Sequence, residues 1–418
     1  MISKAELLTH ARSVQLTPEV VEKDYVLGWL LSAIAHHPDT QTQWVFKGGT
    51  CLKKCVVETW RFSEDLDFSL TPDAAYTAEQ LTTILRDVAS RCHDSSGLVF
   101  PDAGLSVRER RNRQGQPTFE GSVAYRGPLA FPGSPKIRFD LTRNEPILRP
   151  AESRTIFHPY SDALPPDARV ASYSLGELMA EKTRALWERT RPRDLYDVVL
   201  LGTLTRNAEE EDALRQLTRE KFEFKGLVLP DGEAIVEKAR ADAELQSEWK
   251  NMLAHQLPVL PPLDDFLARL EQAIGWLFPH PPEPISRTAG EPRSGGTLAG
   301  ARLGSIPLER DEVIEYASRA ETSGQPTGLD PIRFAGASHL LLDFIYHGNR
   351  RVVEPYALRR PKTGNLLLYA HERSRDGAPT DMIKAYKIHE IGSLRVLQTA
   401  FQPRYVIELS ERPGTWRW

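Results

Sequence analysis

Residues 279–307 divide this chain of 418 residues, because 11 of these 29 positions are Gly or Pro and neither helix nor strand periodicity survives there. We interpret this segment as a linker. Before it, residues 1–170 mix helix and strand patterns, whereas residues 171–278 are mainly helical. The chain also exceeds the usual span of one hydrophobic core. These patterns predict an α/β lobe, a helical lobe and, after the linker, a third unit over residues 308–418.

The composition is typical of a soluble globular protein, with 40% hydrophobic and 26% charged residues. The first residues, MISKAELLTHARSV, contain no apolar stretch long enough for a signal peptide, and nowhere do about 18 apolar residues run together. We therefore expect a cytoplasmic protein with no membrane partner. The chain has three cysteines, Cys51, Cys55 and Cys92, which is an odd number, and they lie in segments that look packed. We therefore expect buried thiols rather than a disulfide or zinc site.

The third unit differs from the rest in both pattern and charge. Residues 308–321 look helical, and strand-like runs such as HLLLDFIYHG and NLLLYAHE follow. These runs predict a small β-barrel or curled sheet. Residues 331–418 carry 14 Lys and Arg against 8 Asp and Glu, whereas the remaining chain carries 39 against 49. Attraction to nucleic acid is thus expected to start at the C-terminal end, although this charge balance is weak evidence of binding.

A glycine turn opens the segment with the most chemistry, residues 46–70. Gly48 and Gly49 allow the backbone to approach a ligand closely, and Thr50 can cap a short helix that follows. Free N–H groups at the start of a helix suit a phosphate. The turn therefore predicts a phosphate-binding site.

A strand follows this turn, and its alternation places Ser63, Asp65, Asp67 and Ser69 on one face. Two carboxylates on one strand face repel each other unless a cation lies between them, and hard oxygen ligands suit Mg²⁺ or Mn²⁺ bridging substrate phosphates. A solvated strand face gives the same alternation. Both interpretations stay open for this motif alone.

A third carboxylate occurs in PKIRFDLTRNE, where Asp140 alternates with buried-type residues and so lies on a polar strand face. If this strand neighbours the strand of Asp65 and Asp67, the three carboxylates form one cluster. Asp140 is then placed to bind a metal or to accept the proton of an attacking hydroxyl.

A predicted helix from Ser174 to about residue 190 begins with Ser174 and Glu177 at capping-box spacing. Lys182 falls on its apolar stripe, which is unfavourable for an ammonium group unless it reaches water or meets an anion. We expect Lys182 to bind the triphosphate of a nucleotide; extension into solvent is the alternative. Further on, a helix-capping role explains Asp194 as well as a functional role does, since it precedes LYDVVLL with Asp197 three residues on.

Five segments in this order resemble the AbiEii/AbiGii toxin family: VEKDYVLGWLL, GGT, Asp-x-Asp after 14 further residues, a strand aspartate, and EKTRAL with RDLYD. The resemblance covers about residues 15–225. It implies a DNA polymerase β-like nucleotidyltransferase fold and the toxin half of a bacterial toxin–antitoxin or phage-defence system, with MenT-type relatives that modify tRNA. An antitoxin is the implied partner.

The resemblance also implies roles for residues. The phosphate-binding turn would be Gly49 and Thr50, with Gly48 and Ser63 beside it. The metal would be held by Asp65, Asp67 and Asp140. The later motifs supply Lys182 and Arg193 for the NTP and add Asp194 and Asp197 to the catalytic set. The expected reaction transfers a nucleotide from an NTP to a hydroxyl of RNA, with tRNA favoured, or of a protein.

The C-terminal stretch over about residues 332–408 is similar to WYL-type domains, which are small Sm-like β-barrels. This implies a regulatory or nucleic-acid-binding module rather than a catalyst. Its basic candidates are Arg350, Arg351, Arg359, Arg360 and Lys362. Arginines near a turn can clamp phosphate, but a charged sheet edge gives the same pattern.

Two other functions stay open at this stage. Three carboxylates and a lysine also serve metal-dependent nucleases, although a nuclease has less need of a phosphate-binding helix start. A ligand-responsive regulator without catalysis would rely on the C-terminal module alone. The presence of every expected catalytic residue argues against that second alternative.

Overall fold

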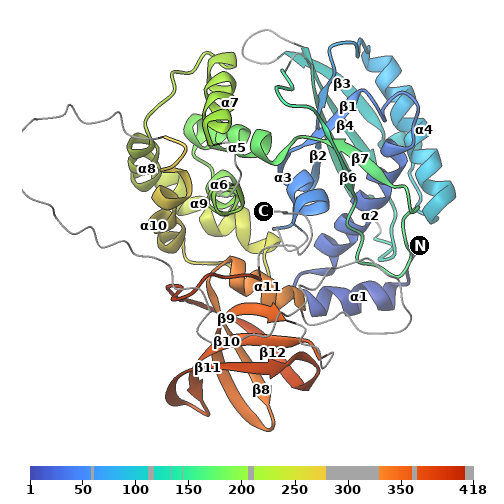
Figure 1. Ribbon diagram of the computed structural model, residues 1–418. Coiled ribbons are helices and arrows are strands. Elements are labelled where there is room, and N and C mark those ends of the chain that lie inside the picture. Colours follow the sequence, from blue (N-terminus) through green and yellow to red (C-terminus); the bar gives the residue numbers. More distant parts are fainter. Residues whose placement is uncertain are drawn as a thin grey trace, which may run out of the picture.

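The computed structural model contains a large sheet with helices, a helical lobe and a second, smaller sheet (Figure 1). The residues that the structure describes are 1–57, 61–111, 117–131, 133–143, 145–205, 211–278, 329–359 and 365–409. The mixed α/β class expected from the sequence is confirmed.

The large sheet has the strand order β3-β4-β5-β2-β1-β7-β6. Most neighbours are antiparallel, but β2 and β5 are parallel, as are β1 and β7. Because β1 and β7 run in the same direction, their C-terminal ends lie at the same end of the sheet. The helices that follow these two strands begin there. The strands are β1 Trp44–Lys47, β2 Asp65–Leu70, β3 Ser106–Arg111, β4 Pro117–Ala124, β5 Lys136–Thr142, β6 Glu152–Thr155 and β7 Arg169–Ser172.

Helices α2 (Pro18–Ala35) and α4 (Ala78–Ser96) pack together over one face of this sheet, with α1 (Lys4–Ser13) beside α2 (Figure 1). Helix α2 is buried on nearly all sides, and α4 starts with a complete capping box between Thr77 and Gln80. The opposite face of the sheet stays available for the polar side chains of β2 and β5.

The helical lobe follows β7 and lies on the other side of the sheet from α2 and α4 (Figure 1). Helix α10 packs against α6, and α5 packs against both α6 and α7. None of the described helices is long and apolar enough to cross a membrane. The helices of this lobe are α5 Leu175–Arg189, α6 Pro192–Thr205, α7 Glu211–Phe224, α8 Gly232–Ala241, α9 Ala243–Leu253 and α10 Leu263–Ile274.

The smaller sheet is antiparallel, with the strand order β11-β10-β9-β8-β12. Its end strands β11 and β12 do not pair with each other among the described residues, so the predicted closed barrel is not shown. The predicted helix at 308–321 lies outside the described residues. The elements here are α11 Leu329–Ala337, β8 Leu340–Tyr346, β9 Asn349–Arg359, β10 Leu367–Arg375, β11 Ala378–Lys387 and β12 Ile391–Ala400.

This C-terminal unit contacts the helical lobe directly. Arg269 of α10 donates to the carbonyl of Ala337 at 3.4 Å, and Gln398 of β12 donates to the carbonyl of Leu260 at 3.2 Å. The apolar residues of both units belong to one buried cluster. The C-terminal unit is therefore packed against the helical lobe.

The three cysteines are buried and unpaired, as predicted. Burial raises the pKa of the Cys92 thiol to about 12. Cys51 and Cys55 lie on the helical segment after β1, and burial raises the pKa of Cys51 as well.

Candidate functional site

The turn after β1 brings backbone and carboxylate together. Gly48 has a φ of +81°, and helix α3 (Gly48–Cys51) starts there before continuing as the π-helical segment η1 (Leu52–Val56). A Cβ at Gly48 would overlap the Asp67 carboxylate. At Gly49, a Cβ would lie 2.7 Å from Arg61 Nη2 and 3.0 Å from Ser63 Oγ. Both glycines therefore allow side chains of the chain itself to approach the backbone closely, and the approach of a ligand stays a prediction.

The prediction that Thr50 caps the helix is wrong. The positive φ of Gly48 starts the helix three residues earlier, with Lys47 at the capping position and no side-chain cap. Thr50 is buried inside the helix, where its hydroxyl donates to the carbonyl oxygen of Asp65 at 2.5 Å. Thr50 thus ties the helix to β2 instead of facing a phosphate with its side chain.

Strands β2 and β5 are neighbours, and their parallel register pairs Asp67 with Asp140. The adjacency that the sequence could only assume is confirmed. Asp65 pairs instead with Arg138. Asp67 and Asp140 therefore face each other across the two strands, while Asp65 lies two residues along the same face, a separation of about 6.6 Å in a strand.

The pKa of each of the two facing carboxyl groups is raised above its ordinary value. Burial raises the pKa of Asp67 first, the charges of Asp140 and Asp65 raise it further, and Lys47 and Lys182 offset part of the effect, leaving a pKa of about 6. Enclosure by the strands also raises the pKa of Asp140, although its outer side is exposed. The pair is thus poorly neutralised by the protein itself.

A divalent cation would relieve this repulsion, and the carboxylate oxygens are the hard donors that Mg²⁺ prefers. Within the described parts of the chain, no three His, Cys, Asp or Glu residues come together in an arrangement that could hold a metal ion. Asp65 stands apart along β2, as its register with Arg138 shows. The donors fit a Mg²⁺ held by one or two carboxylates and completed by water and substrate phosphates, which is the usual way proteins bind it.

Lys47 is a functional candidate that sequence reasoning missed. It ends β1 opposite Asp67, forms a buried ion pair with Glu145, and donates to Thr142 Oγ1 at 3.2 Å. Burial alone would lower the pKa of Lys47, but Glu145 outweighs it and raises the pKa; in return Lys47 and Lys225 hold the pKa of Glu145 low. A lysine at the end of a buried strand, directly before Gly-Gly, was the available signal.

Lys182 is buried and does not extend into solvent. Its ammonium lies 2.8 Å from Asp197 and 3.5 Å from Asp194, both on α6. It also lies close enough to Asp67 to lower the pKa of that carboxyl. A buried ammonium group needs an anion, and Asp194 and Asp197 of the neighbouring helix provide it. Lys182 is thus near both these aspartates and the pair of Asp67 and Asp140.

Asp194 and Asp197 are members of a buried charge network. Helix α6 starts at Pro192, so the alternative that Asp194 caps it is wrong. Asp194 instead accepts two hydrogen bonds from Arg189, at 2.6 and 2.9 Å. Asp197 accepts two from Arg61, at 2.8 and 2.7 Å. Burial would raise the pKa of Asp197, but Arg61 and Lys182 lower it to about 2.

Arg61 is the second residue that sequence reasoning missed. Its side chain is 2% exposed, and besides Asp197 it donates to Gln256 Oε1 at 2.9 Å. The segment before β2 is thus joined to α6 and to the turn η3 (Ala254–Gln256) that follows α9. This network fixes the helical lobe relative to the glycine turn.

The remaining predicted residues lie around this network. Arg193 is partly buried at the start of α6, where burial and the charge of Arg61 lower its pKa. Ser174 caps α5 by accepting from the Glu177 backbone at 3.2 Å. The Glu177 carboxylate bonds Leu148 and Lys221 instead of closing the predicted capping box.

Comparison with known proteins decides the family. Residues 29–272 match the family described as nucleotidyl transferase AbiEii toxin, Type IV TA system. The chain belongs to this family. Its members are nucleotidyltransferase toxins, as the description states. Among solved structures, MenT4, a nucleotidyltransferase toxin from Mycobacterium tuberculosis H37Rv, is similar with 21% identity and a TM-score of 0.45, over 66% of this chain and 90% of that one. No curated protein matches the chain.

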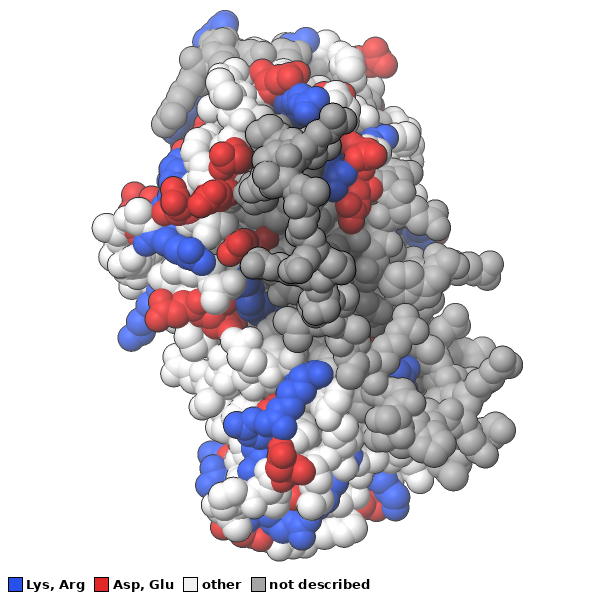
Figure 2. All heavy atoms as spheres, turned by 60° about the vertical axis from the view of Figure 1, so that its left-hand side comes forward, with Lys and Arg blue, Asp and Glu red and all other residues white. Residues whose placement is uncertain are grey.

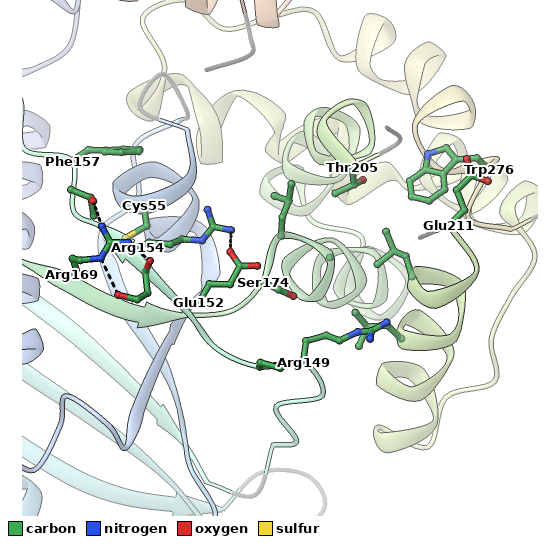
Figure 3. Close-up of a pocket in the computed structure, with 17 residues that line it drawn as sticks. Cys55, Arg149, Glu152, Arg154, Phe157, Arg169, Ser174, Thr205, Glu211 and Trp276 are labelled. Atoms are coloured by element: carbon green, nitrogen blue, oxygen red, sulfur yellow. Dashed lines mark hydrogen bonds and ion pairs between the residues drawn. The ribbon is translucent and has the colours of Figure 1, made fainter. Parts of the chain in front are cut away.

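A separate cavity of about 890 Å³ lies between the β6 edge of the sheet and the helical lobe of this AbiEii-family chain (Figure 3). It is lined by Arg149, Arg154 and Arg169 and, on the far side, by Trp276. None of the predicted site residues lines it. Arg154 pairs with Glu152 at 2.5 Å and Arg169 donates to Ser153 and Thr155, so these arginines brace the edge strand.

The predicted basic residues of the C-terminal unit are already paired where they are described. Arg350 donates to both oxygens of Asp343, at 2.8 and 2.9 Å, and Arg351 lies 3.1 Å from Glu372. Arg359 pairs with Glu408. Arg360 and Lys362 lie outside the described residues. Figure 2 shows Lys and Arg interspersed with Asp and Glu on this unit, an arrangement that suits ion pairing within the sheet.

Replacing Gly48 with alanine should reduce nucleotide transfer by at least about tenfold, because the new Cβ would displace the Asp67 carboxylate. The positive φ adds a stability cost of about 1–2 kcal/mol. We would measure label transfer from an NTP together with the midpoint of urea unfolding.

Gly226→Ala is the matched control. Gly226 has a φ of +68°, but a Cβ there would have nothing within 4 Å. This variant should show a similar loss of stability with unchanged transfer. Equal activity of the two variants would show that the position of Asp67 does not depend on Gly48.

Proposed function

We propose that this toxin transfers a nucleotide from an NTP to a hydroxyl of RNA, with tRNA as the favoured acceptor and a protein hydroxyl as the alternative. The observation that carries the proposal is the facing pair of Asp67 and Asp140 directly beside the Gly48 turn. Phosphate groups and metal-binding carboxylates must lie side by side in such a reaction. The pair and the helix start supply both at one place.

The proposed roles follow from position. The backbone at Gly48, Gly49 and Thr50 starts a helix and faces the phosphates, with the Ser63 hydroxyl near Gly49. Arg193 adds positive charge at the same end of the site. The acceptor oxygen attacks the α-phosphorus, the P–O bond to pyrophosphate breaks, and the hydroxyl proton passes to a carboxylate of the pair, for which Asp140, exposed on its outer side, is suited.

Asp67 and Asp140 are the residues that would hold Mg²⁺ or Mn²⁺ directly, and Asp65, two residues along the same strand face, is proposed as the third carboxylate of the site. When bound, such an ion neutralises phosphate charge and makes the acceptor hydroxyl more acidic. Lys182 adds a cation on the helical side of the pair. Asp194 and Asp197 act as positioning residues, because they hold Lys182, Arg189 and Arg61 in place.

The C-terminal sheet is proposed to be a WYL-like regulatory module, and the toxin to work with an antitoxin in a type IV toxin–antitoxin or phage-defence system. The family description supports the antitoxin. The described antiparallel strands and the packing of this unit against α10 support a regulatory position next to the transferase. A regulator there can act on the enzyme through the helical lobe.

The test incubates purified protein with each α-³²P-labelled NTP, Mg²⁺ and total bacterial RNA. Wild type should label RNA, whereas Asp65→Ala and Lys182→Ala should reduce labelling by about 100-fold or more, because the first removes a carboxylate proposed for the metal site and the second removes a positive charge beside the transferred phosphate. Asp73→Ala is the control, since Asp73 is exposed in the turn after β2 and should leave labelling unchanged.

A metal-dependent nuclease is the second candidate, favoured by the same carboxylate pair. Shortened RNA without transferred label would support the nuclease and overturn the transferase. Label on protein alone would keep the transferase and change the acceptor.

A further inference from the structure

One face of the large sheet extends from the carboxylate pair to the β3 edge without a break. Across the strands, the register runs Arg108, Glu120, Asp140, Asp67 and Lys47, each the Cα partner of the next. Residues paired in this way lie on the same face of a sheet, about 4.8 Å apart. The paired carboxylates are therefore the inner end of a polar surface that reaches the edge of the molecule.

Beside Arg110, this surface carries the exposed cations Arg108 of β3 and Lys136 and Arg138 of β5. None of these three forms an ion pair with a described residue. Arg110, by contrast, is neutralised by Glu120 at 2.9 Å. Arg138 adjoins Ser122, which shares a hydrogen bond of 3.0 Å with Ser106. We call Arg108, Lys136 and Arg138 the basic face.

The basic face carries no apolar side chain that could anchor a protein partner. In β5 the buried residues Ile137, Phe139 and Leu141 all point to the other side, toward the core. In β4 the partners on this face are Thr118, Glu120, Ser122 and Ala124, and Ala124 is small and buried against Gly104, so it offers no anchor. Protein interfaces are rich in aromatic and apolar anchors, whereas contacts to nucleic-acid backbones come mainly from Arg, Lys and hydroxyl groups. The chemistry fits a phosphate backbone.

We propose that the basic face binds the phosphate backbone of the RNA acceptor and directs its reacting end toward Asp67 and Asp140. This inference rests on the proposed transferase function and adds the surface that selects the acceptor. Lys136 and Arg138 lie two residues apart on one strand face, so two successive contacts to one RNA strand lead along β5 to the pair. Arg108 extends the contact outward to β3.

The test measures binding of fluorescein-labelled bulk bacterial tRNA by anisotropy at several salt concentrations. The Arg108→Glu/Lys136→Glu variant avoids Asp65 and its neighbour Arg138. It should bind at least about tenfold more weakly, and the slope of log K against log salt should fall by about 1.5, because each lost phosphate contact removes about 0.7–0.9. Binding of the preferred NTP should be unchanged, which also shows that the variant is folded.

Lys4→Glu/Arg12→Glu is the control, with two exposed cations of α1 reversed in the same way. Equal weakening of tRNA binding in both variants, or none in the basic-face variant, would overturn the proposal. If the wild type transfers no nucleotide, yet tRNA binding still depends on Arg108 and Lys136, the docking surface stands while the transferase function fails. If label is transferred to a protein and this transfer depends on Arg108 and Lys136, the basic face binds a protein instead of RNA. That result would overturn the inference.

Discussion

Asp67→Asn should lower nucleotide transfer by at least about 100-fold and, in EDTA at pH 8, make the protein more stable than wild type. The pKa of Asp67 is about 6, so folding favours the protonated carboxyl. Its contribution to stability is present below about pH 4 and is lost as the pH rises through 6. Asparagine imitates the protonated form at every pH, so the variant avoids this loss, which is on the order of 1–2 kcal/mol.

The measurement is the difference in unfolding temperature between Asp67→Asn and wild type from pH 4 to pH 8, since other titrating groups cancel in this difference. It should be near zero at pH 4 and reach a few degrees at pH 8. Adding Mg²⁺ should stabilise wild type more than the variant. Asp73→Asn should show no trend with pH, and a variant that follows wild type throughout would show that the Asp67 carboxylate is well solvated.

Arg61→Met should destabilise the fold by about 3–5 kcal/mol, because it leaves the fully buried carboxylate of Asp197 with Lys182 as its remaining described cation. It also removes the bond from Arg61 to Gln256, which joins the glycine turn to the helical lobe. The urea midpoint should fall strongly, and transfer should fall with it even under conditions where the variant is still folded.

Arg86→Met provides the comparison, because Arg86 is 57% exposed and its ion pair with Asp102 spans 3.6 Å. Its loss should cost less than about 1 kcal/mol. The double variant Arg61→Met/Asp197→Asn should cost less than the sum of its single changes, since the second change removes the carboxylate charge that has lost Arg61. Additive costs would show that Arg61 and Asp197 do not depend on each other.

Alternation in the sequence was enough to place the carboxylates, because period-two patterns report directly which side chains share a strand face. Asp65, Asp67 and Asp140 lie on the face that the pattern predicts. The same pattern could not show that Asp140 faces Asp67 while Asp65 faces Arg138. Register between strands about 70 residues apart depends on the whole sheet.

The buried ion pairs could not be predicted from the sequence, for a different reason. Arg61 and Asp197 are 136 residues apart, and neither position is marked by periodicity. Lys182 was recognised as an ammonium group in need of an anion, but the sequence did not indicate that Asp194 and Asp197 of α6 would pair with it. Thr50 was assigned a cap because the helix was expected to start after the glycines, whereas the positive φ of Gly48 starts it within them.

The anchoring of Arg61 and Phe62 by Gln256 also bears on how the toxin is made. Both bonds close a loop of nearly two hundred residues, since Arg61 and Gln256 are 195 positions apart. A chain leaving the ribosome presents Asp65, Asp67 and Asp140 long before Gln256 is synthesised, and domains fold as units once their parts are available. A nascent or prematurely terminated chain that ends before Gln256 therefore carries every aspartate of the candidate site but lacks one of the residues that join Arg61 to the helical lobe.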